Sequence, residues 1–96
     1  MIKHIVIWKL AGDDAAKKAT FEEFKKDTDH LREIIPEVKD LKVGLNTNGG
    51  AYQLVLDGIF ANEADLNTYA NHPEHVAMKN SMKGKMTDRI AVDYEF

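Results

Sequence analysis

The sequence predicts an α+β protein whose elements follow one another in the order βαββαβ. Four segments alternate apolar and polar residues with the period of two that is typical of strands. After the first and the third of these segments, apolar residues recur at steps of three and four, as on one face of a helix. With 96 residues and no repeat or linker, the chain is predicted to be a single domain spanning residues 1–96.

The first predicted strand, Ile2–Leu10, carries apolar side chains on both faces. One face presents Ile2, His4, Val6, Trp8 and Leu10, and the other presents Lys3, Ile5, Ile7 and Lys9. Such a strand is expected at the centre of the sheet, covered by helices on one side and by a second sheet on the other. His4 then lies beside Val6 and Trp8, either as a core histidine satisfied by one hydrogen bond or as part of a pocket lining.

The first predicted helix follows a turn at residues 11–14 and runs to Ile35. Its inward stripe is Phe21, Phe24, Thr28, Leu31 and Ile35. The spacing of Thr20 and Glu23 matches a capping box, so the strongly formed part is expected to begin at Thr20, with residues 15–19 as a lead-in. Pro36 ends the helix. His30 is expected to face solvent and is assigned no function.

Three further strands are predicted, two of them joined as a hairpin. Residues 38–46 and 52–60 flank an Asn- and Gly-rich turn, and residues 89–96 close the chain. Asp57 and Gly58 predict a bulge inside the second hairpin strand. In the closing strand Ile90, Val92, Tyr94 and Phe96 alternate with Arg89, Ala91, Asp93 and Glu95. The resulting order is the split βαβ, or ferredoxin-like, arrangement.

The second helical segment begins with Asn62 as its N-cap and is interrupted by Pro73. Proline is comfortable as the first residue of a helix, so one helix is expected to end near Asn71 and another to begin at Pro73, with His72 near its N-cap. His75 then lies in a first helical turn, where the positive end of the helix disfavours imidazolium.

A functional site is expected where Pro73 interrupts the second helical segment. A neutral His75 is a candidate base and Tyr69 a candidate hydrogen-bond partner; the alternative is that both residues serve packing and a local cap. The pair His72 and His75 also suggests a metal, but zinc needs three or four protein ligands. Only two other histidines and no cysteine remain, so neither a metal nor a cofactor is expected.

Composition narrows the function classes. The net charge is −3 and the basic residues are scattered, which argues against a nucleic-acid partner. No apolar run approaches the roughly 20 residues of a membrane span, and residues 1–4 already have a strand-like pattern. Neither a membrane span nor a signal peptide is therefore expected. The absence of cysteine excludes a disulfide scaffold and fits a cytoplasmic protein.

The sheet predicted here has helices on only one face. The other face exposes apolar residues such as Ile5, Ile7 and Val55, as a patch larger than soluble monomers usually tolerate. Two copies packed sheet to sheet around a two-fold axis would cover it, so the expected partner is a second copy of the chain.

Four blocks together resemble the stress-responsive dimeric α+β barrel (Dabb) family. They are Lys3-His4-Ile5-Val6, Ile34-Ile35-Pro36, Tyr69-x-x-His72-Pro73-x-His75-Val76 and Val92-Asp93-Tyr94. The resemblance covers nearly the whole chain and implies ferredoxin-like protomers whose sheets pair into a barrel.

The resemblance also implies roles for individual residues. Plant polyketide cyclases of this family close a poly-β-keto chain by aldol condensation without metal or cofactor. By that similarity Tyr69 and His75 fall on the catalytic Tyr and His, and His4 falls on a pocket His. Leu54 stands where the cyclase has a further pocket His. The candidate ligand-binding residues are His4, Trp8, His72 and Leu54.

The sequence is compatible with two functions. In the first, the chain binds or transforms a small, partly apolar carbonyl compound by His and Tyr acid–base chemistry. In the second, it is a non-catalytic homodimer with a structural role under stress. A cavity of a few hundred Å³ reached by His4, Tyr69 and His75 would favour the first function, and a filled interior the second.

Overall fold

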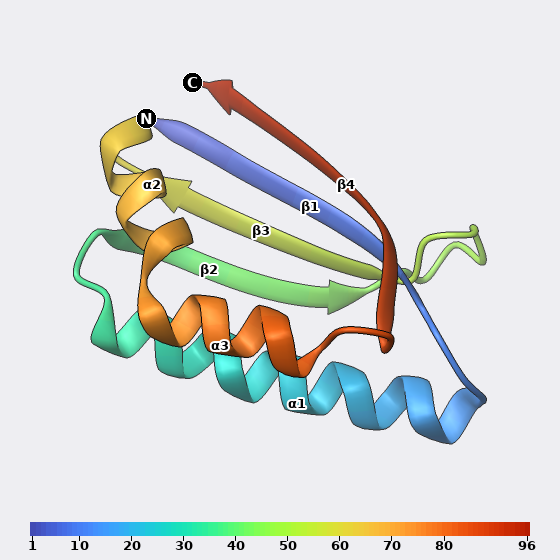
Figure 1. Cartoon of the computed structure of the whole chain (residues 1–96). Helices are drawn as coiled ribbons and strands as arrows, with labels where there is room; N and C mark the ends of the chain where they lie inside the picture. Colours follow the sequence, from blue (N-terminus) through green and yellow to red (C-terminus); the bar gives the residue numbers. More distant parts are fainter.

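The computed structural model describes all residues from Met1 to Phe96. Its elements are β1 (Ile2–Leu10), α1 (Asp14–Ile34), β2 (Val38–Leu45), β3 (Leu54–Phe60), α2 (Glu63–Asn71), α3 (Pro73–Ser81) and β4 (Met86–Glu95). The strands form one antiparallel sheet in the order β2-β3-β1-β4, and the three helices lie on the same side of it (Figure 1). The predicted βαββαβ order is confirmed, with the second helical segment divided in two. None of the helices is long and apolar enough to cross a bilayer.

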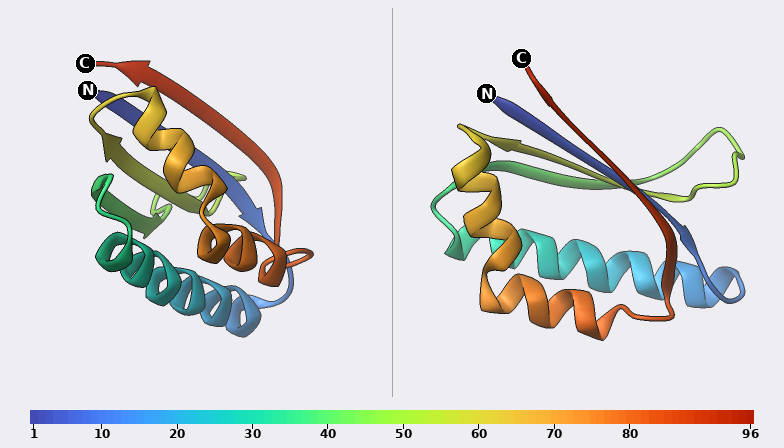
Figure 2. Two further views of the ribbon diagram at one scale, coloured as in Figure 1. Left: turned by 60° about the vertical axis from the view of Figure 1, so that its left-hand side comes forward. Right: turned by 45° about the horizontal axis from the view of Figure 1, so that its top comes forward.

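Strand β1 is central, as predicted. It pairs with β3 on one side and β4 on the other, so that His4 lies between Gly58 and Asp93. Side chains at its even positions turn toward the helices, where Ile2, Val6 and Leu10 are buried in the core. The opposite face of the sheet carries no helix (Figure 2).

Helix α1 is continuous from Asp14, so the predicted helix after the turn at residues 11–14 is confirmed, whereas the strongly formed start predicted at Thr20 is wrong. The Asp13 carboxylate accepts a hydrogen bond of 2.8 Å from the Ala16 amide and caps the helix about two turns before Thr20. Thr20 is instead an interior residue of the helix and is buried. The inward stripe is confirmed at Phe24, Thr28 and Leu31, and the helix ends before Pro36 as predicted.

The predicted bulge at Gly58 is absent. Gly58 pairs in regular register with His4 on one side and Leu41 on the other, and the irregularity of this hairpin lies in β2 between Val38 and Asp40. A side chain at Gly58 would place its Cβ 3.1 Å from the Phe60 ring and 3.2 Å from Leu41. The glycine is therefore explained by close packing rather than by a bulge.

Strand β4 has two unlike faces. Ile90, Val92, Tyr94 and Phe96 are exposed on the side away from the helices, which extends the apolar patch predicted from the sequence. The register with β1 shifts so that Asp88 and Arg89 together lie opposite Trp8, and Asp88 adopts a φ of 55°. This bulge lies at the start of β4, next to the helices.

Candidate functional site

The break between α2 and α3 follows the predicted pattern. Pro73 occupies the first turn of α3, and the His72 ring caps that helix by accepting a 3.2 Å hydrogen bond from the Glu74 amide. In an uninterrupted helix that amide would bond to the Ala70 carbonyl. The break thereby frees the Ala70 carbonyl, which accepts a 2.9 Å hydrogen bond from Nδ1 of His75.

This hydrogen bond fixes the chemistry of the His75 ring. A carbonyl oxygen can only accept, so the hydrogen lies on Nδ1 and leaves Nε2 with its lone pair in the neutral ring. Burial lowers the pKa of His75 below its ordinary 6.5; the bond to Ala70 opposes this shift, and the charges of Lys79 and Arg89 add to it. The neutral form was predicted from the positive end of the helix, but burial is the larger cause.

Tyr69 and His75 lie against each other despite their spacing of six residues. Their ring centroids are 4.4 Å apart, whereas on an unbroken helix the two side chains would point about 120° apart. Tyr69 is 1% exposed, and burial raises the pKa of its phenol, with Arg89 acting weakly in the opposite direction. The phenol therefore keeps its proton and is a hydrogen-bond donor.

His4 approaches the pair from the sheet. Its ring centroid is 6.5 Å from that of Tyr69, and its Nδ1 lies 2.5 Å from a carboxylate oxygen of Asp93. Asp93 orients the His4 ring, because an ionised carboxylate accepts only from a protonated nitrogen. The alternation of the last strand places Asp93 on its polar face but predicts no role for it. The missing information was the register that sets it opposite His4.

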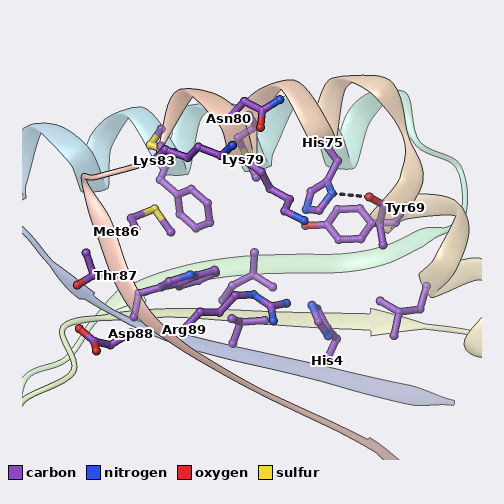
Figure 3. Close-up of a pocket in the computed structure, with 18 of the residues that line it drawn as sticks. His4, Tyr69, His75, Lys79, Asn80, Lys83, Met86, Thr87, Asp88 and Arg89 are labelled. Carbon is purple, nitrogen blue, oxygen red and sulfur yellow. Dashed lines mark hydrogen bonds between the residues drawn. The ribbon is translucent and has the colours of Figure 1, made fainter.

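A cavity of about 620 Å³ joins these residues between the sheet and α3 (Figure 3). Among the predicted residues His4, Trp8, Tyr69 and His75 line it. His72 and Leu54 do not: the His72 ring caps α3, and Leu54 is buried in the core. Half of the 20 residues around the cavity are hydrophobic, and they include Val6, Phe24, Leu56, Met78, Met82 and Met86. No group of three or more His, Asp or Glu side chains converges closely enough to hold a metal ion.

The family model of the stress-responsive A/B barrel domain, Dabb, matches residues 2–96. The chain belongs to the Dabb family. The resemblance inferred from its sequence blocks is thus confirmed. No curated protein matches the sequence.

Several solved structures are similar to this Dabb chain. A dimeric protein of unknown function from Bacteroides fragilis is 36% identical, with a TM-score of 0.92 and 99% of this chain and 95% of that chain covered. A Dabb family protein from Mesorhizobium loti is 21% identical, with a TM-score of 0.79 and coverages of 99% and 95%. A hydroxynitrile lyase from Passiflora edulis is 16% identical, with a TM-score of 0.81 and coverages of 97% and 90%. The last two share the fold with this chain at low identity.

Proposed function

We propose that this Dabb protein binds a small, partly apolar carbonyl compound and acts on it by cofactor-independent acid–base chemistry of the cyclase or lyase type. The observation that carries the proposal is the pairing of a neutral His75 with a protonated Tyr69 on the wall of a 620 Å³ cavity. A base and a hydrogen-bond donor at one wall are the two groups that enolate formation requires.

The proposed step is a proton transfer at the carbon next to the carbonyl. Nε2 of His75 takes the proton, and the electron pair of the broken C–H bond moves into the carbonyl to give an enolate. The Tyr69 hydroxyl donates a hydrogen bond to the enolate oxygen, where negative charge develops. His75, now an imidazolium, returns a proton to the carbon, or the enolate carbon forms a bond to a second carbonyl carbon and the proton goes to the alkoxide that this bond creates. The apolar side chains around Trp8 hold the rest of the compound.

The proposal includes a homodimer formed through the open face of the sheet. Ile90, Val92, Tyr94 and Phe96 are between 46% and 61% exposed on that face. Exposed apolar side chains in this number are typical of an interface. The Bacteroides fragilis relative is described as dimeric, and a self-complementary contact of two sheets is the simplest way to cover the patch.

Deuterium exchange tests the acid–base chemistry without knowledge of the natural substrate. The probe is 4-phenyl-2-butanone, which combines a methyl ketone with an apolar ring, followed by proton NMR in D₂O. We expect protein-dependent loss of the signals next to the carbonyl, reduced about 100-fold or more by His75→Gln and by Tyr69→Phe. His30→Gln is the control, because His30 is exposed and lies outside the cavity. A rate equal to that of buffer, or one unchanged in both variants, would overturn the proposal.

The second function, a non-catalytic homodimer of structural value, makes the opposite prediction. It is favoured by the same apolar sheet face, which needs a partner whether or not the cavity is used. A dimer in solution without any exchange or ligand binding would favour this alternative.

A further inference from the structure

Three cationic side chains surround the cavity in a chain whose net charge is −3. They are Lys79, Lys83 and Arg89. None of them takes part in an ion pair with a carboxylate of the chain. The cavity wall also holds two carboxylates, Asp88 and Asp93. The wall therefore has an excess of one positive charge, which is complementary to a monoanion.

Two of the cations are placed beside the proposed reaction site. Lys79 follows His75 by four residues on α3, so both side chains leave the helix on one face. Arg89 comes from the bulge in β4 and points into the cavity toward His4 (Figure 3). Burial raises the pKa of Tyr69 and lowers that of His75; the charge of Arg89 opposes the first shift and adds to the second.

Neither of the two carboxylates prevents an anion from binding near Lys79 and Arg89. Asp93 is occupied by its hydrogen bond to His4. Asp88 is exposed and lies at the far end of the labelled residues from His75 in Figure 3. An anion between Arg89 and Lys79 would thus meet two cations and one carboxylate that already has a partner.

We propose that the ligand of this cavity is a keto acid, whose carboxylate lies between Arg89 and Lys79 and whose carbonyl lies at Tyr69 and His75. This inference rests on the proposed function and adds the charge and the substrate class. The planar guanidinium of Arg89 can bind a carboxylate through two parallel hydrogen bonds. In such a ligand the carboxylate is next to the reacting carbonyl, and an apolar tail can then contact Trp8 and Phe24, which also line the cavity and whose rings are 5.3 Å apart.

Trp8 provides the readout, because it is the only tryptophan of the chain and lines the cavity. The probes are 2-oxo-4-phenylbutanoate and its neutral isostere 2-oxo-4-phenylbutanamide, titrated against the full chain while Trp8 fluorescence is recorded. At low ionic strength we expect the acid to bind about tenfold more tightly than the amide. High salt should reduce this preference, because Arg89 and Lys79 are exposed side chains.

Variants that each remove one positive charge test whether the preference for the acid depends on Arg89 and Lys79. Arg89→Gln and Lys79→Gln are each expected to reduce the ratio of acid to amide affinity, and the double variant is expected to abolish the preference for the acid. Lys39→Gln removes the same charge from an exposed position of β2 outside the cavity and should keep the preference.

The outcomes distinguish this inference from the proposed function. Equal binding of acid and amide, or a preference that persists in the double variant, overturns the keto-acid inference alone. If neither probe changes Trp8 fluorescence, the cavity takes no such ligand, and the proposed function falls together with the inference.

Discussion

Replacement of Tyr69 by Phe should separate function from stability. The Tyr69 side chain is 1% exposed and packs on Phe60 and His75, with ring centroids 5.2 Å and 4.4 Å away. The Nδ1 atoms of its two histidine neighbours are bonded to Asp93 and Ala70, and the Tyr69 hydroxyl has no hydrogen-bond partner within the protein. The packing is a property of the ring, which Phe retains. The Tyr69 hydroxyl can therefore donate a hydrogen bond to a ligand.

The expected magnitudes follow from these contacts. Because the Tyr69 hydroxyl makes no hydrogen bond within the protein and is not one of its buried unpaired atoms, Tyr69→Phe should leave the free energy of unfolding unchanged to within about 1 kcal/mol. Tyr69→Ala, by contrast, should lower it by about 3–5 kcal/mol because the ring is lost from the core. Loss of the hydrogen bond to a developing enolate should reduce deuterium exchange into 4-phenyl-2-butanone by about 100- to 1,000-fold.

Urea unfolding followed by circular dichroism measures the first quantity, and the NMR exchange assay measures the second. Tyr52→Phe is the matched control, since it removes a hydroxyl from a residue outside the cavity. A loss of more than about 2 kcal/mol in Tyr69→Phe would mean that the hydroxyl has a structural partner. Full exchange activity in Tyr69→Phe would refute its role as the donor.

Three further predictions follow from other parts of the molecule. Because the folded-state pKa of His75 lies below 6.5, protonation favours the unfolded chain, and the free energy of unfolding should decrease as the pH falls from above 6.5 through the folded-state pKa. In urea titrations at several pH values, His75→Gln should reduce this pH dependence. An NMR titration that gives His75 a pKa at or above 6.5 would contradict the argument. Val92→Lys should shift the protein toward monomers in sedimentation velocity, because it places a charge in the apolar sheet face, where Val92 is 55% exposed; an unchanged dimer would exclude that face. Gly58→Val should lower the free energy of unfolding by about 1–3 kcal/mol, since its Cβ would lie 3.1 Å from the Phe60 ring; unaltered thermal unfolding would show that the ring can move aside.

The features predictable from the sequence are those decided by neighbours along the chain. Pro73 at the first helical position and His72 as a cap are local rules, and both are confirmed. The start of α1 also depends on a local rule, but the capping-box spacing predicts it at Thr20, whereas the carboxylate of Asp13 makes the cap. Sequence spacing alone does not show which residue caps the helix, because that depends on the tertiary structure, in which Thr20 is buried.

The parts of the site that sequence reasoning missed depend on pairing between strands. Asp93 acts on His4 because β1 and β4 are antiparallel in a register that sets these residues opposite each other. Arg89 lies on the same face of β4 as Asp93, next to the extra residue inserted opposite Trp8. Neither the register nor the insertion is visible in the alternation of a single strand, so both residues could be assigned only to a face.

Strand β4 contributes one face to the cavity and the other to the proposed dimer interface, because its side chains alternate. Its inner residues Arg89 and Asp93 line the cavity, and its outer residues Val92 and Tyr94 belong to the apolar face proposed to bind a second copy. As an edge strand, β4 is held to the rest of the sheet only through β1, so a partner sheet packed on its outer face would restrict its motion. In the proposed dimer, the position of Arg89 and Asp93 relative to His4 would therefore depend on the partner, although neither residue faces it. The partner would then contribute rigidity to the site and not a side chain.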